Sequence, residues 1–128
     1  MASSEQHGKP MILLVEDEPS EREPIARHLR EHGFSVEVVD DSDAALALLK
    51  KRSDIRGLVT DAHVPGKIDG FELAALVRER WPELAVVMMS GHSDESSGPI
   101  PDGGDFVSKP YLFSHLVPAL NRLMGRAS

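Results

Sequence analysis

The sequence predicts an α/β fold, a doubly wound, five-stranded parallel sheet with helices on both faces. The fourth helix, between the fourth and fifth strands, is expected to be short or missing. Five short runs rich in Val, Ile, Leu and Met alternate with helical patterns along the 128 residues. This alternation indicates parallel strands, because a parallel neighbour is reached only through a crossover, and right-handed crossovers cover both faces. Reactive side chains follow several of the runs, at the sheet edge where ligands gather in such folds.

The five expected strands are short and apolar. The first, MILLV, ends at an acidic cluster, and the other four have the length and composition of strands that are buried on both faces. In chain order the strands are expected at residues 11–15, 36–39, 57–60, 85–89 and 105–107.

Four helical patterns accompany the strands. In each pattern the apolar residues recur at helical spacing. In chain order, the four groups are Ile25, Ala26 and Leu29; residues 44–49; Phe71, Leu73, Leu76 and Val77; and Leu116, Ala119, Leu120 and Leu123. The residues suited to helix ends are Ser42 and Ser114 as N-caps, Gly33 and Gly125 after last turns, and Pro24 and Pro118 within first turns. Residues 92–105 contain three Gly, two Pro and three Ser, so we expect a loop or a single turn there.

Length and composition indicate one domain, at residues 10–124, between flexible tails at 1–9 and 125–128. The net charge of -7 disfavours nucleic acid as a partner, because binding to phosphates needs clustered Lys and Arg. No apolar run approaches the roughly 20 residues of a membrane helix, so no membrane partner is expected. The polar start lacks a signal-peptide pattern, which predicts a cytoplasmic location.

Charged and hydroxyl side chains follow four of the expected strands. They are Glu16, Asp17 and Glu18 after the first strand, Asp61 at the end of the third, Ser90 after the fourth and Lys109 after the fifth. Because the carboxyl ends of parallel strands meet at one edge of a sheet, we expect these groups to converge although they are far apart in the sequence.

The chemistry of this set points to phosphoryl transfer. Close carboxylates repel one another, and hard oxygen ligands without Cys or His favour Mg²⁺, with Mn²⁺ possible. Asp61 can act as a nucleophile and form an acyl phosphate. Lys109 would offer positive charge to one phosphate oxygen, and the Ser90 hydroxyl could hydrogen-bond to another.

These residues resemble the receiver domain of bacterial two-component response regulators, in its stand-alone form. The motifs that carry the resemblance are VED at 15–17, DAHVPG at 61–66, DG at 69–70, MSG at 89–91 and SKP at 108–110. They extend over essentially the whole chain. The resemblance implies a flavodoxin-like fold with strand order 2-1-3-4-5.

The resemblance also implies a role for each residue at the strand ends. It makes Asp61 the phosphoacceptor, Lys109 the contact to the acyl phosphate, Ser90 the switch hydroxyl and Phe106 the switch aromatic residue. The implied metal ligands are Asp17, Asp61 and the backbone carbonyl of His63, with Glu16 acting mainly through bound water. Lys109 and Pro110 resemble the cis peptide of the family.

The implied function is a signalling switch that catalyses only its own phosphorylation and dephosphorylation. The phosphodonor would be a sensor histidine kinase or a histidine phosphotransfer protein, and the output would be contact with an unknown downstream protein. Two alternatives remain. One is a phosphohydrolase with an Asp nucleophile, although the first strand is followed by Glu16-Asp17-Glu18 and not by D-x-D. The other is a degenerate receiver that only docks to partners.

Three features depart from the commonest family pattern. One extra residue lies between Pro65 and Asp69, so the loop after Asp61 is expected to be longer. The segment from Ser90 to Lys109 is a few residues shorter than usual. Phe106 lacks the hydroxyl of the commoner Tyr, so any rotation of its ring would be driven by packing. Elsewhere, His28 and His32 share an i, i+4 spacing but have no further ligands, and we interpret them as surface residues.

Overall fold

The computed structural model describes residues 9–90, 104–109 and 112–125. The strands are β1 (Met11–Val15), β2 (Ser35–Val39), β3 (Ile55–Asp61), β4 (Ala85–Ser90) and β5 (Gly104–Ser108). The helices in the described residues are α2 (Pro19–Glu31), α3 (Ser42–Lys51), α4 (Gly70–Arg80) and α5 (Leu112–Met124). All five expected strands are present; the first has the expected bounds, and the bounds of the other four differ from the prediction by at most two residues.

The strands form one parallel sheet in the order β2-β1-β3-β4-β5, which confirms the doubly wound flavodoxin-like topology. Strand β3 lies in the middle of the sheet, and its last residue, Asp61, is aligned with Met89 of β4. The carboxyl ends of β1, β3, β4 and β5 therefore meet at one edge, as the sequence predicts.

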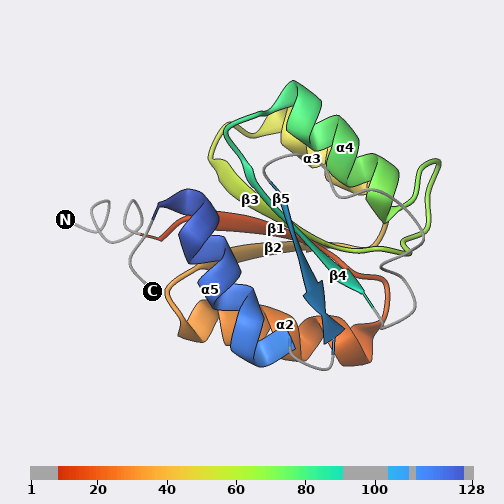
Figure 1. Cartoon of the computed structure of the whole chain (residues 1–128). Coiled ribbons are helices and arrows are strands. Elements are labelled where there is room, and N and C mark those ends of the chain that lie inside the picture. The colour runs from red at the N-terminus through yellow and green to blue at the C-terminus, as the bar shows by residue number, and fades with distance from the viewer. Residues whose placement is uncertain (1–8, 91–103, 110–111, 126–128) are drawn as a thin grey trace.

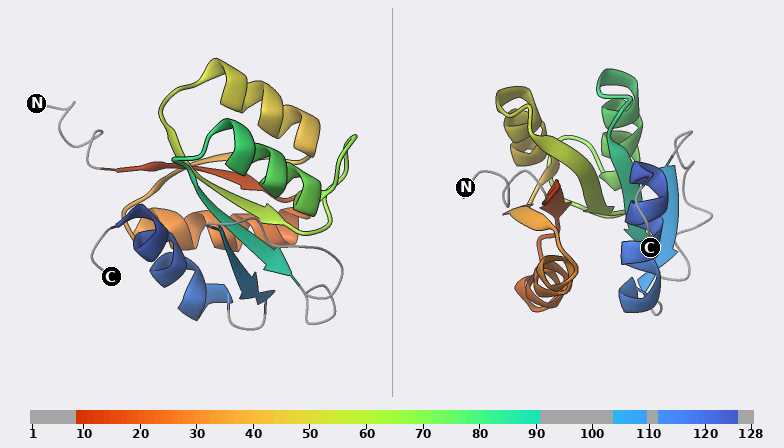
Figure 2. Two further views of the ribbon diagram at one scale, coloured as in Figure 1. Left: turned by 45° about the horizontal axis from the view of Figure 1, so that its top comes forward. Right: turned by 90° about the vertical axis from the view of Figure 1, so that its left-hand side faces the viewer.

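Two apolar layers cover the sheet, one on each face. Helices α2 and α5 lie on one face and α3 and α4 on the other, as both views of Figure 2 show (Figures 1 and 2). Alternate residues of β1 divide between them: Ile12 and Leu14 pack under α2 and α5, whereas Leu13 and Val15 pack under α3 and α4. Burial on both faces explains why the strands are almost uniformly apolar.

Aspartates cap two of the helices. Asp41 accepts a hydrogen bond from the backbone amide of Ala44 at 2.7 Å, so the cap of α3 is Asp41 and the prediction of Ser42 was wrong by one position. At α4, Asp69 and Glu72 form a reciprocal capping box. Both caps lie at the edge of the sheet that carries Asp61.

The prolines and Ser114 were placed incorrectly. Pro24 is the sixth residue of α2 and Pro118 the seventh of α5, so neither lies in a first turn. Both helices begin earlier than their apolar patterns suggest. Helix α2 starts at Pro19, whose fixed φ suits a first helical position. Ser114 is the third residue of α5 and is not its N-cap.

Some predictions lie outside the described residues. Residues 91–103 and Pro110 are not described, so the predictions of a loop after β4 and of a cis peptide before Pro110 stay predictions. Gly33 and Gly125 have φ values of 91° and 72°, as expected for residues that follow helices. None of the helices in the described part of the chain has the length and hydropathy required to cross a membrane.

Candidate functional site

Asp61 ends the central strand and is 7% exposed. One carboxylate oxygen, Oδ1, accepts a hydrogen bond from the backbone amide of His63 at 3.1 Å. The other, Oδ2, accepts one from the Lys109 ammonium at 2.7 Å. The 48 positions that separate Asp61 from Lys109 in the sequence are bridged by the parallel sheet, which places the ends of β3 and β5 at the same edge.

Lys109 also contacts a second carboxylate. Its ammonium lies 3.0 Å from Oε1 of Glu21, in the first turn of α2. Burial alone would lower the pKa of Lys109, but hydrogen bonds to Asp61 and Glu21 and the nearby negative charges outweigh burial and raise it. The ammonium is therefore held as a fixed positive charge against Asp61.

Glu16 is fully buried directly after β1. Its backbone amide extends the ladder by donating to the carbonyl of Val39 at 3.1 Å. Oε2 accepts a hydrogen bond from the amide of Glu18, whereas Oε1 has no hydrogen-bond partner among the described residues. Burial and the negative charge of Asp61 together raise the pKa of Glu16 to about 7.

Three carboxylates come together at this edge. One oxygen from each of Glu16, Glu21 and Asp61 lies within 4.8 Å of the other two. Glu21 was not predicted from the sequence. The available signal was Pro19, because a helix that begins there places Glu21 in its first turn, next to the acidic loop. Asp17 lies outside this group and is exposed, and its role as a metal ligand stays a prediction.

The donor set fits a hard divalent cation. Every member is a carboxylate, without sulfur or imidazole, and such ligands suit Mg²⁺ or Mn²⁺. The buried Glu16 Oε1 also lacks a donor of its own in the described part of the chain. A cation at this position would relieve the repulsion among the carboxylates.

The hydroxyl of Ser90 is buried at the end of β4 and has no hydrogen-bond partner among the described residues. A buried hydroxyl without a partner is costly in a folded protein, so a ligand oxygen here would be stabilising. Phe106 lies half-buried in β5, with its ring centroid 6.4 Å from that of Phe71 in α4. Its ring therefore contacts the layer that α3 and α4 form.

The loop after Asp61 is packed tightly against its surroundings. The amide of Gly70 donates to the carbonyl of Ala62 at 3.0 Å, and a Cβ at this position would collide with the carbonyl oxygen of Asp61. Further along the loop, the carbonyl of Pro65 accepts a hydrogen bond from the amide of Ser42 at 3.0 Å. Gly66, at φ 121°, fits against the same serine, where a side chain would clash.

The chain is similar to proteins that are named as response regulators. It is 32% identical over 115 residues to an NtrX-like response regulator of Rickettsia conorii, and the match covers 87% of this chain and 24% of that protein. It is 37% identical over 120 residues to the transcriptional regulatory protein TcrA of Mycobacterium tuberculosis, covering 90% and 46% of the two chains. The chain thus spans about a quarter of the first relative and about half of the second.

Solved structures show the same similarity. A response regulator receiver protein from Sinorhizobium medicae superposes with a TM-score of 0.81 at 30% identity, covering 91% of this chain and 95% of that one. The regulator TrrA of Thermotoga maritima, solved in complex with Mg²⁺ and BeF, superposes with a TM-score of 0.77 at 25% identity, covering 88% and 97%. The family model of the response regulator receiver domain matches residues 12–121. The chain therefore belongs to the response regulator receiver domain family of two-component signalling.

Proposed function

We propose that this receiver domain is a switch that accepts a phosphoryl group on Asp61 with the help of Mg²⁺. The observation that carries the proposal is the buried Asp61 carboxylate, held by Lys109 at 2.7 Å beside the buried Glu16. Such an arrangement offers a nucleophile, a fixed positive charge and carboxylates for a cation in one pocket.

The reaction is a displacement at phosphorus. A carboxylate oxygen of Asp61 forms a new bond to phosphorus while the bond from phosphorus to the donor's imidazole nitrogen breaks, and that nitrogen then takes a proton from solvent. The Lys109 ammonium would contact one oxygen of the phosphoryl group during the transfer and neutralise part of its charge. The unpartnered Ser90 hydroxyl would donate to another oxygen.

Mg²⁺ would be held by Asp61 and Asp17 with the backbone carbonyl of His63, and by Glu16 through water. The ion supplies positive charge that neutralises the transferring phosphoryl group. Glu21 lies close enough to the other carboxylates to add to the negative field of the site. The Thermotoga TrrA structure, which contains Mg²⁺ and BeF in a related fold, supports Mg²⁺ as the cation.

The switch would act through Ser90 and Phe106. Phosphorylation adds charge and strong acceptor oxygens beside Asp61, and Ser90 would move toward them. Phe106 could then repack against Phe71 without forming a new hydrogen bond, since its ring has no hydroxyl. The altered surface would be recognised by a downstream protein.

The phosphodonor would be a sensor histidine kinase or a histidine phosphotransfer protein that docks beside Lys109. Phe113 of α5 is 50% exposed and is the large apolar side chain most open to solvent in the described part of the chain. It borders a hollow of about 290 Å³ that also includes Lys109, Glu21 and Pro24. An apolar contact beside the reactive pocket would orient the donor histidine.

Incubation with acetyl phosphate and Mg²⁺, followed by intact mass measurement, tests the proposal. We expect one phosphate adduct on the wild-type protein and none on D61N. The absence of an adduct, together with no response to beryllofluoride, would contradict the proposal and favour a module that only docks. Repeated turnover of p-nitrophenyl phosphate would point to a phosphohydrolase instead.

A further inference from the structure

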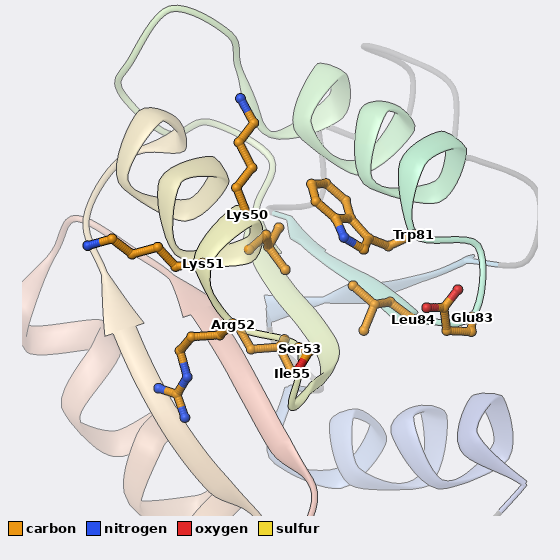
Figure 3. A pocket seen from close by; sticks show the side chains of 9 residues that line it. Lys50, Lys51, Arg52, Ser53, Ile55, Trp81, Glu83 and Leu84 are labelled. Atoms are coloured by element: carbon orange, nitrogen blue, oxygen red, sulfur yellow. The ribbon is translucent and has the colours of Figure 1, made fainter.

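A hollow of about 250 Å³ lies at the opposite edge of the sheet from Asp61, where the strands begin. It opens between the C-terminal ends of α3 and α4, as Figure 3 shows. Its apolar floor consists of the buried Leu49, Ile55 and Leu84. None of these residues takes part in the proposed phosphorylation chemistry.

The walls of the hollow differ in character. Trp81, directly after α4, is half-buried on one side, and the stem of Lys50 rises from α3 on the other (Figure 3). The guanidinium of Arg80 lies 5.9 Å from the centroid of the Trp81 ring. An apolar side chain entering the hollow would therefore meet an indole, an aliphatic stem and an apolar floor.

Among the described residues, two of the three cations at the rim of the hollow take part in no ion pair. Arg52 is already paired with Glu37 at 3.1 Å and with Asp54 at 2.7 Å. Lys50 and Lys51 are exposed, and within the described residues no ion pair involves either one. The chain has a net charge of -7, but this hollow presents two ammonium groups beside an apolar floor.

The volume of the hollow favours a single side chain over a small molecule as its ligand. Small-molecule pockets usually measure roughly 300–1,000 Å³, so about 250 Å³ is small for a cofactor or a drug-sized ligand. A pocket that takes one apolar anchor, surrounded by a polar rim, is instead the usual centre of a protein interface. The free lysines select for negative charge around that anchor.

We propose that this hollow, lined by Leu49, Lys50, Ile55, Trp81 and Leu84, docks an acidic segment of a partner protein that inserts one apolar side chain. The anchor would contribute most of the affinity, and Lys50 and Lys51 would select the acidic flanks. Glu83, an exposed acid that also lines the hollow, opposes the same ligand. None of these side chains takes part in the proposed chemistry at Asp61, so binding is testable in the unphosphorylated protein.

The test uses the fluorescence of Trp81, the single tryptophan of the chain. The probe is an N-acetylated, C-amidated pentapeptide with a central leucine and two glutamates on each side. We expect a saturable change in the fluorescence of the wild-type protein. Replacing the central leucine with serine should abolish the change, whereas phenylalanine should preserve it.

Variants at the rim separate this site from the general charge of the protein. K50E/K51E should weaken binding at least about fivefold, since each lost pair removes roughly 0.5 kcal/mol and the reversed charges add repulsion. R27E/R30E makes the same charge change on two exposed residues of α2, on the other face of the sheet, and should leave affinity within about twofold. E83K should strengthen binding, because it replaces the acid that opposes the ligand with a cation. Misfolding of a variant would weaken binding, so it could not account for this result.

Several results would overturn the proposal. These are the absence of saturable binding to the wild-type protein, equal losses in K50E/K51E and R27E/R30E, and weaker binding to E83K. A single-stranded oligonucleotide is tested in the same way. If it quenches the fluorescence of Trp81, if K50E/K51E abolishes that quenching and if the peptide does not bind, the partner is a nucleic acid and not a protein. Failure of Asp61 to accept phosphate would leave the proposal untouched.

Discussion

Lys109 lies between two carboxylates that differ in their exposure to solvent. The side chain of Asp61 is 9% exposed and that of Glu21 is 44% exposed. Solvent therefore screens the Glu21 ion pair far more strongly than the Asp61 pair. Asp61 holds the ammonium, while Glu21 mainly adds negative charge to the pocket.

Removing that charge should weaken cation binding. We expect E21Q to lower the affinity for Mg²⁺ about fivefold, because a charge roughly 4 Å away contributes about 1 kcal/mol even in water. Isothermal titration calorimetry measures the affinity. E23Q removes an exposed carboxylate from the same helix, outside the group of three, and should have little effect. Equal losses in both variants would show that only the net charge matters.

The raised pKa of Glu16 predicts how stability depends on pH. Without a divalent cation, folded Glu16 keeps its proton up to about pH 7, whereas the unfolded chain releases it near the ordinary value of 4.5. The group therefore stabilises the fold fully below pH 4.5, and this contribution is lost as the pH rises through 7. The slope is at most about 1.4 kcal/mol per pH unit for one proton.

Urea unfolding at pH 5, 6 and 7, without Mg²⁺, checks this expectation. His28 works in the opposite direction, because burial and the charge of His32 lower its pKa, so the measurement compares wild-type protein with E16Q. The advantage of the wild type over E16Q should shrink between pH 5 and 7. A constant difference would mean that Glu16 titrates normally. Saturating Mg²⁺ should reverse the trend, since the cation binds ionised carboxylates.

At the scale of elements, the position of a helix start decides which side chains reach the site. The five strands were predictable because strands buried on both faces must be apolar, and the strand-end residues Asp61, Ser90 and Lys109 followed from them. Glu21 was missed because the apolar pattern of α2 begins at Ile25, six residues after the helix itself starts. Apolar periodicity marks the buried face of a helix and not its first turn.

Gly70 joins α4 to the phosphoacceptor strand through a close backbone contact. A Cβ there would collide with the carbonyl of Asp61, so G70A should destabilise the fold by about 1–3 kcal/mol and slow phosphorylation by acetyl phosphate. Denaturant unfolding and the rate of adduct formation measure the two effects.

Gly125 provides the matched control for Gly70. Its φ of 72° makes alanine unfavourable, but among the described residues no atom beyond its chain neighbours and its own helix backbone lies within 4 Å of the position of a Cβ. G125A should therefore cost about 1 kcal/mol through the backbone alone and leave phosphorylation unchanged. Unimpaired phosphorylation of G70A would mean that the loop relaxes without displacing Asp61.

At the scale of the whole molecule, the reactive pocket and the proposed docking hollow occupy opposite edges of one sheet. The parallel, doubly wound sheet could be predicted from the sequence because crossover rules leave few topologies, and its strand order followed from the family resemblance. The docking hollow could not be predicted from the sequence, because it depends on how the ends of α3 and α4 lie relative to the first residues of β3 and β4. Lys50 and Trp81 are 31 positions apart, and only their placement in space makes them neighbours.

The exposed Phe113 predicts a difference between protein and small-molecule phosphodonors. F113S should slow phosphotransfer from a phosphorylated histidine phosphotransfer protein about tenfold or more, because it removes an apolar anchor next to Lys109. Phosphorylation by acetyl phosphate should keep its rate. Radiolabel transfer measures the first rate, and slowing of both reactions would place Phe113 in the chemistry and not in docking.

The hydrogen bond from Ser42 to Pro65 connects the two edges of the molecule mechanically. Helix α3 has ten residues, so it is a rod about 15 Å long. One end of the rod is tied to the loop that follows Asp61, and the other end carries Leu49 and Lys50 of the distant hollow. A shift of this loop by a fraction of an ångström would move the first residue of α3, and because the helix is rigid it would also move Leu49 and Lys50 at its other end.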